Sequence, residues 1–268
     1  MDVTQVTERL CGGCGAPLRE DDCLCEQCGA RAVADQPDGD RAELDLVGAA
    51  AVSDRGRAHR RNEDAFALEL AGERAGAAVI CDGISSATAG DLAAGSAAAA
   101  AASVLAAAAV DDRRNLRAAV GEAIDAAHAA VAQVPWTTRV DRAMPSCTVV
   151  CTLWRGGEIV VGSVGDSRAY WIDGEGVQQL TVDDSWAEEQ VADGRLSAAQ
   201  AMRDPRSHSI THWIGADAPP RPPRLVTLAP DRPGRLLLCS DGLWNYVPTA
   251  AGLQTTASPA ASPRLPRS

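Results

Sequence analysis

From about residue 47 onward, the hydrophobic positions of the chain fall into short continuous runs bounded by polar, glycine-containing turns. Runs of this length between turn signals are typical of buried strands. The strands predicted in this way are 48–53, 66–69, 79–81, 148–154, 158–165, 169–172 and 235–240.

Two longer segments, 91–109 and 116–133, are predicted to be helices. The second has apolar residues at helical spacing. Two long helices outside successive hairpins indicate an α+β layered sandwich rather than alternating βαβ units. Segment 92–110 is uncharged and long enough to span a membrane. Because it is mostly alanine, we expect it to pack closely on a sheet, and we expect no membrane association.

The composition limits the classes of partner. With 268 residues, the chain can form one substantial domain and a small attachment. The formal net charge of −11 argues against nucleic acid as a partner, since that would require a basic surface. The N-terminal residues are acidic and lack an apolar core, so no signal peptide is expected. Nothing implies an oxidising compartment, and a cytoplasmic location is expected.

A cysteine cluster near the N-terminus has the spacing of a zinc site. Cys11 and Cys14 form one C-x-x-C-G motif, and Cys25 and Cys28 form a second one. Two such motifs can provide four thiolates to one tetrahedral zinc ion in a closed, structural site. The alternative, a redox C-x-x-C motif, requires a βαβ context that is absent here. Cys23 is expected to pack or to remain a free thiol.

These patterns divide the chain into four segments. They are a zinc ribbon at 1–31, a polar linker at 32–46, the main domain at 47–247 and a disordered tail at 248–268. The tail has several prolines and no apolar periodicity, which is typical of a segment without regular structure.

Carboxylates follow the ends of two of the predicted strands. The run ending at Cys81 leads into Asp82 and Gly83, and the run ending at Ser240 leads into Asp241. A third acidic pair, at 63–64, follows a glycine-broken stretch. Carboxylates gathered at strand ends commonly hold hard divalent cations such as Mg²⁺ or Mn²⁺.

Six motifs follow one another between about residues 49 and 247. They are S-D-R-G at 53–56, N-E-D-A-F at 62–66, C-D-G at 81–83, S-C-T at 146–148, V-G-D-S-R-A-Y at 164–170 and C-S-D-G-L-W at 239–244. In this order they resemble the motifs of the PP2C (PPM) family of metal-dependent serine/threonine phosphatases. The resemblance implies a four-layer α/β/β/α sandwich with two central antiparallel sheets flanked by helices. It also implies hydrolysis of phosphoserine and phosphothreonine by a metal-activated water, against a bacterial-type Ser/Thr kinase.

The same resemblance assigns roles to individual residues. Asp82 would bridge two Mn²⁺ or Mg²⁺ ions, the Gly83 carbonyl would reach one of them, and Asp241 would bind the other. Glu63 and Asp64 would hold metal-bound waters. Asp166 matches a position implicated in a third metal site.

The sequence departs from the family pattern around the phosphate. His59 stands where family members often have an arginine that binds the substrate phosphate, and an imidazole cannot reproduce the fork of a guanidinium. Arg57, Arg60 and Arg61 are the candidate substitutes. The histidine that often follows the Asp-Gly pair is also missing, which leaves His208 as a weaker candidate for the site.

No carboxylate follows Asp241 in this sequence. The resemblance implies a further Asp beyond this point that shares a metal ion with it. We therefore expect a truncated domain, incomplete at its C-terminal side, with one weakened metal site and low activity. The alternative function is a catalytically impaired domain that binds phosphoproteins or serves as a docking module. A regulatory phosphatase of the stress-response type is a third possibility.

Overall fold

The computed structural model describes residues 9–10, 17–18, 40–57, 59–72, 74–137, 142–218, 221–247 and 250–256. The chain forms two compact units. One consists of 1–43 and 52–62, and the other of 44–51 and 63–268. The predicted zinc ligands Cys11, Cys14, Cys25 and Cys28 lie outside the described residues, so the zinc site remains a prediction.

Two short strands lie near the N-terminus. They are β1 (Arg9–Leu10) and β2 (Pro17–Leu18), and they pair in antiparallel fashion.

Strand β3 (Arg41–Leu46) pairs with β4 (Ala49–Asp54) in a two-stranded sheet. At its open end, the Arg41 guanidinium lies 2.8 Å from the Asp54 carboxylate. The prediction of a linker over 32–46 is therefore wrong for the residues of β3. The signal was present in the sequence, because polar and apolar residues alternate strictly along this strand, which is the period of a half-buried strand.

The main layer of the second unit is a five-stranded antiparallel sheet in the order β13-β9-β8-β6-β5. Four of these strands contain the runs predicted from hydrophobicity, whereas β13 has no counterpart among the predictions. The bounds are β5 (Asp64–Leu70), β6 (Ala75–Asp82), β8 (Val149–Arg155), β9 (Glu158–Val164) and β13 (Arg224–Leu228).

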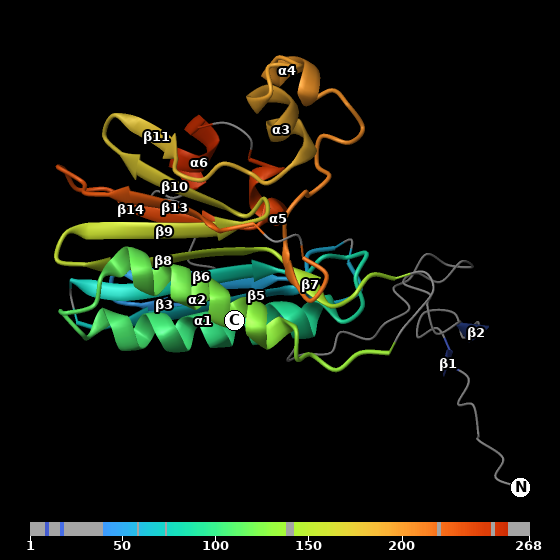
Figure 1. The fold of residues 1–268 in the computed structure, drawn as a ribbon, viewed down its shortest axis with the longest axis horizontal. Coiled ribbons are helices and arrows are strands. Elements are labelled where there is room, and N and C mark those ends of the chain that lie inside the picture. Colours follow the sequence, from blue (N-terminus) through green and yellow to red (C-terminus); the bar gives the residue numbers. More distant parts are fainter. Residues whose placement is uncertain are drawn as a thin grey trace, which may run out of the picture. The chain divides into compact units, whose positions relative to one another are not determined.

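Helices α1 (Gly90–Ala109) and α2 (Leu116–Val131) cover one face of this sheet (Figure 1). The side chain of Asn115 accepts a hydrogen bond from the backbone N–H of Ala118 and so caps the start of α2. Ten residues of α1 are buried. In the part of the chain that the structure describes, α1 alone has the length and hydropathy of a membrane span. Its packing on the sheet agrees with the predicted core helix.

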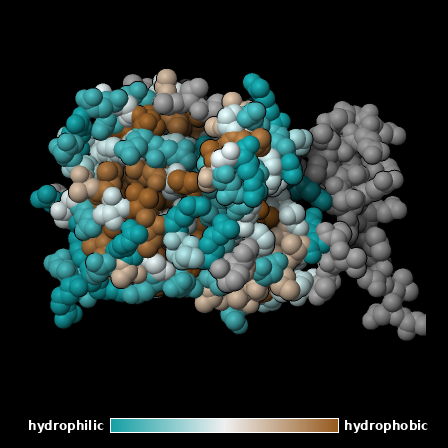
Figure 2. Space-filling model, turned by 45° about the horizontal axis from the view of Figure 1, so that its top comes forward, coloured by the Kyte–Doolittle hydropathy of each residue, from teal (hydrophilic) through white to brown (hydrophobic). Residues whose placement is uncertain are grey.

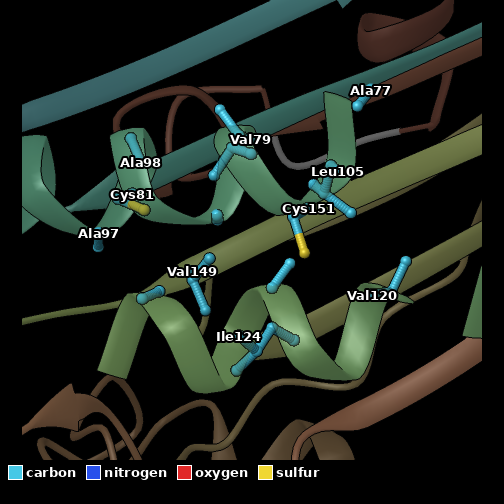
Figure 3. Close-up of a cluster of buried hydrophobic side chains, with 14 of the residues drawn as sticks. Ala77, Val79, Cys81, Ala97, Ala98, Leu105, Val120, Ile124, Val149 and Cys151 are labelled. Carbon is cyan, nitrogen blue, oxygen red and sulfur yellow. The ribbon is translucent and has the colours of Figure 1, made fainter. Parts of the chain in front are cut away.

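The core between helices and sheet combines small and branched side chains. Figure 3 shows that Leu105 of α1 and Val120 of α2 belong to the same buried cluster as Val79, Val149 and Cys151 of the sheet. All five side chains are at most 1% exposed. The many alanines of α1 allow its backbone to approach the strands closely, because their side chains occupy little volume.

A three-stranded antiparallel sheet in the order β11-β10-β14 forms the next layer. Its strands are β10 (Arg168–Asp173), β11 (Gly176–Gln179) and β14 (Arg235–Cys239). Ala169 packs with Val150 and Val161 of the larger sheet. Figure 2 is turned toward this side of the molecule and shows apolar surface among hydrophilic side chains.

The other face of β10 is covered by α6 (Ala250–Thr256), whose Leu253 packs against Tyr170 and Ile172. The second unit thus has the expected four layers, α/β/β/α. The prediction that 248–268 is disordered is wrong for α6. Prolines 248 and 259 bracket this segment without entering it, and its alanines favour a helix.

The remaining elements are short. They are β7 (Ser146–Cys147), α3 (Trp186–Ala192), α4 (Ala198–Ala201), β12 (Ile214–Gly215) and α5 (Asp241–Trp244). Strands β7 and β12 pair with each other.

Candidate metal centre

Two of the predicted ligands lie at one end of the β5–β6 pair. Asp64 begins β5 and Asp82 ends β6, and the two residues are cross-strand partners. Side chains alternate along a strand, so Asp82 shares a face with Ile80 two residues earlier. Because Ile80 packs in the cluster between the two sheets, Asp82 lies at the end of that inter-sheet layer.

The turn after Asp82 depends on glycine. The Gly83 N–H donates to the Glu63 carbonyl at 3.0 Å. A Cβ atom added to Gly83 would lie 2.5 Å from the backbone of Gly90, at the start of α1. Only glycine permits this approach, so the Gly83 backbone is fixed beside Asp82 by its contacts with Glu63, directly before β5, and with the start of α1.

Asp82 is also fixed from the neighbouring strand. Its backbone N–H donates to the Thr148 hydroxyl at 3.3 Å, and its carbonyl accepts from the Thr148 N–H at 2.8 Å. The Thr148 hydroxyl in turn shares a hydrogen bond of 2.7 Å with Ser167. Both hydroxyl residues are at most 1% exposed. This buried pair connects Asp82 to the turn that carries Asp166.

Asp241 lies at the end of a strand of the smaller sheet. It is the first residue of α5, directly after β14. The preceding residue, Ser240, donates its hydroxyl to the Asp64 carboxylate at 3.3 Å. This bond ties the end of β14 to the start of β5. The Asn245 amide donates to Asp241 at 3.3 Å.

Asp166 lies on the turn between β9 and β10 and is 6% exposed. Its carbonyl accepts a hydrogen bond of 3.0 Å from the Trp244 indole N–H. The Arg168 guanidinium lies 3.7 Å above the Trp244 ring and pairs with Asp183 at 2.7 Å. The turn that bears Asp166 and the helix that bears Asp241 are therefore held together by Trp244.

The carboxylates repel one another. The pKa of Asp82 lies well above its ordinary value because of burial first, and then because of the charges of Asp64, Asp241 and Asp166. A hydrogen bond with Asp241 adds to this rise. Burial and then the charge of Asp241 raise the pKa of Asp166 to about 7. These four residues form a concentration of negative potential that a cation would relieve.

The donor set fits a hard divalent cation chemically, because it consists of carboxylates at strand ends. Its present geometry is open. Within the described ranges, no three His, Cys, Asp or Glu side chains already enclose a common metal position. The residues thus fit the chemistry of Mn²⁺ or Mg²⁺, although their side chains are not arranged as a closed cage.

The predicted phosphate-binding residues belong to the first unit. Arg57, His59 and Arg60 are exposed on the segment between β4 and β5. Their assignment to a substrate phosphate remains a prediction. His208 is also exposed, and its ring stacks on Trp244 with 5.8 Å between ring centroids. It therefore borders the helix that carries Asp241.

Several residues around the site had no role in the sequence analysis. Trp244 and Arg168 stand in recognisable motifs, but only the fold shows that they contact each other. Asp184 had no signal at all. It is 1% exposed and accepts a hydrogen bond of 3.1 Å from the Gly165 N–H, next to Asp166.

Comparison with known proteins finds similarity to one family of phosphatases. The family model of protein phosphatase 2C matches residues 55–264. The Listeria innocua serine/threonine phosphatase Stp is 34% identical over 103 residues, which are 38% of this chain and 40% of that protein. The Mycobacterium tuberculosis phosphatase PstP is 31% identical over 198 residues, which are 72% of this chain and 36% of PstP. The chain thus spans well under half the length of these relatives.

Solved structures show the same fold. Stp1 from Staphylococcus aureus matches with a TM-score of 0.63 and 25% identity, over 78% of each chain. The catalytic domain of the PstP phosphatase, in complex with two manganese ions, matches with a TM-score of 0.52 and 27% identity, over 76% of this chain and 77% of that one.

Proposed function

Because the chain belongs to the protein phosphatase 2C family, we propose that it hydrolyses phosphoserine and phosphothreonine in proteins with two bound Mn²⁺ or Mg²⁺ ions. One observation carries the proposal. Asp64, Asp82, Asp166 and Asp241 come from separate parts of the chain, and their charges act on one another at the end of the inter-sheet layer. The manganese ions of the related catalytic domain support the choice of metal.

Each carboxylate would have its own role in binding the cations. Asp82 is the central residue, because its pKa responds to the other three charges, and it would contribute to both metal positions. Asp241 would bind one ion, and Asp64 and Glu63 would orient waters around them. The Gly83 carbonyl belongs to the residue directly after Asp82 and would reach one of the ions. Asp166 would provide a further, looser position.

When bound, the two cations would supply an activated water and neutralise charge on the phosphoryl oxygens. The residues around the carboxylates fix the positions of the proposed metal ligands. The Thr148–Ser167 pair holds the backbone of Asp82, and Trp244 holds the turn of Asp166 against α5. No side chain of the protein needs to act as a nucleophile in this mechanism.

The substrate phosphate requires cationic partners. We propose that Arg57 or Arg60 provides them, with His59 as a single-point donor. Arg57→Ala and Arg60→Ala should raise the KM for a phosphopeptide while leaving Mn²⁺ binding unchanged. If both variants keep the parent's KM, this assignment is wrong.

The metal ion that Asp241 holds should bind less tightly than the other ion. The sequence contains no Asp or Glu after Asp241, so this ion has fewer carboxylates within the chain. A titration of Mn²⁺ should therefore resolve a tight and a weak site. Two sites of equal affinity would contradict this proposal.

We also propose a structural zinc ion on Cys11, Cys14, Cys25 and Cys28. Measurement of bound zinc in purified protein, with Cys25→Ser as the variant that should lose it, tests this proposal directly. A cytoplasmic location is supported by the four free, buried cysteines of the second unit, which are Cys81, Cys147, Cys151 and Cys239. The proposed partners are phosphorylated proteins and a Ser/Thr kinase system.

The test of the main proposal is hydrolysis of a phosphothreonine peptide with Mn²⁺. We expect turnover by the parent chain, loss of turnover with EDTA, and a loss of at least about a hundredfold in Asp82→Asn. Asp125→Asn is the control, because Asp125 is an exposed carboxylate on α2. Absence of turnover at saturating Mn²⁺ would reject the proposal. The relatives are named as phosphatases, which favours an enzyme over the alternative of an inactive binding domain.

A further inference from the structure

We propose that Asp184 is a positioning residue that fixes the turn of Asp166 to the segment between α4 and β13. The inference rests on the proposed function, because it assigns Asp166 to a metal position. Asp184 lies on the loop between β11 and α3 and is 1% exposed. A carboxylate so deeply buried must be compensated by hydrogen bonds or charges, and its partners show what it holds.

The first set of partners is the backbone of the ligand turn. The Asp184 carboxylate accepts from the Gly165 N–H at 3.1 Å, and the Asp184 N–H donates to the Gly165 carbonyl at 2.8 Å. Gly165 has a φ of +100°, and a Cβ atom there would lie 2.7 Å from the Thr148 side chain. Asp184 thus forms hydrogen bonds with both backbone groups of the residue directly before Asp166, at a position where a side chain would collide with Thr148.

The second set comes from the segment between α4 and β13 and from Arg224, the first residue of β13. The Thr211 N–H donates to the Asp184 carbonyl at 2.8 Å. The Arg224 Nε donates to the carboxylate at 2.9 Å, and Arg221 lies 3.7 Å from the same oxygen. The His212 Nδ1 lies 3.4 Å from the other oxygen.

Asp184 therefore connects two parts of the chain through one side chain. One carboxylate oxygen faces the arginines, and the other faces His212 and the Gly165 N–H. Loss of the carboxylate would leave the Gly165 N–H buried without this acceptor, and the turn would lose one of the contacts that fix it. Residues that orient a metal ligand in this way typically change metal affinity when they are removed.

The experiment measures Mn²⁺ binding by calorimetry, with thermal unfolding in EDTA as a second readout. Asp166→Asn defines which part of the binding depends on Asp166. We expect Asp184→Ala to weaken that same part by about tenfold to a hundredfold. Asp184→Asn keeps an oxygen that can accept from the Gly165 N–H, so it should retain most of the affinity.

Leu105→Ala serves as the control for loss of stability alone. Leu105 is a fully buried core residue of α1 and lies fifteen positions after Gly90, the residue of this helix that approaches Gly83. It should lower the unfolding temperature and leave Mn²⁺ binding as in the parent. If Asp184→Ala does the same, Asp184 is merely structural and the inference is overturned. It is also overturned if Asp184→Asn loses as much affinity as Asp184→Ala, because the hydrogen bond to the turn would then not be the cause.

Failure of the inference can be told apart from failure of the proposed function. If the parent binds Mn²⁺ and Asp184→Ala weakens the Asp166-dependent part, the inference holds even when no peptide is hydrolysed. If Asp166→Asn binds Mn²⁺ like the parent, the inference fails, although turnover by the parent would still support the phosphatase. Should Asp184→Ala not fold, Arg224→Gln must produce a smaller loss in the same part of the binding, and an unchanged affinity would overturn the inference.

Discussion

Asp64 and Asp82 form the last cross-strand pair of β5 and β6, so two carboxylates stand directly opposite each other at the end of a largely buried sheet. Like charges in this position destabilise a strand pair. The sheet tolerates them beside two more carboxylates, Asp166 and Asp241, which also raise the pKa of Asp82. The arrangement weakens the metal-free fold and favours the binding of a cation.

The substitution Asp82→Asn should therefore make the metal-free protein more stable while removing its response to metal. At pH 8 in EDTA, we expect the free energy of unfolding to rise by about 1–3 kcal/mol, because one member of the repelling set becomes neutral. Added Mn²⁺ should stabilise the parent but not the variant. Urea unfolding with and without Mn²⁺ measures both effects. A variant less stable than the parent in EDTA would show that Asp82 has a stabilising partner instead.

The metal-free protein should also lose stability as the pH rises. The folded-state pKa of Asp166 is about 7, against an ordinary value of 3.8, so the folded state binds this proton more tightly than the unfolded state. The resulting contribution, on the order of a few kcal/mol, is complete below about pH 4 and is lost as the pH rises through about 7. Urea unfolding in EDTA at pH 5 and pH 8 measures it as the difference between the parent and Asp166→Asn. If that difference does not change with pH, Asp166 does not titrate as described.

Much of the fold was predictable because hydrophobic runs and turns are local signals. The strands that carry the site and both long helices correspond to predicted segments, and the positions of Asp82 and Asp241 at strand ends agree with the prediction. Strand β13 could not be identified, because its run is short and lies among prolines. The Trp244–Asp166 hydrogen bond joins residues 78 positions apart, and no local pattern predicts such a contact. The buried Asp184 is a similar case, since its partners come from three different segments.

The start of α1 contains a strained residue. Ala89 has φ 55° and ψ 45°, and it is the one non-glycine residue with positive φ in the part of the chain that the structure describes. Ala89→Gly should raise the free energy of unfolding by about 1 kcal/mol, because a left-handed conformation is costly for a residue with a Cβ atom. Ala99→Gly, at an exposed interior position of α1, should lower it by about 1 kcal/mol. Thermal and urea unfolding of both variants test the difference in sign, and equal signs would contradict the strain at Ala89.

The docking of α6 can be tested at a single side chain. Leu253 is 3% exposed and belongs to the cluster of Tyr170, Ile172 and Trp244. Leu253→Ala should lower the free energy of unfolding by about 2–3 kcal/mol, since it removes buried methyl groups and leaves a cavity over the smaller sheet. Thr255→Ala is the matched control, because Thr255 is exposed and its hydroxyl bonds only to Ala251 of the same helix among the hydrogen bonds of the described residues. It should change stability by less than about 0.5 kcal/mol.

Equal, negligible effects of the two substitutions in urea unfolding would mean that the segment is not packed in solution, as its prolines and weak periodicity had suggested. A large effect of Leu253→Ala together with weaker Mn²⁺ binding would further show that α6 supports the site through Trp244, which contacts both the cluster and the carbonyl of Asp166.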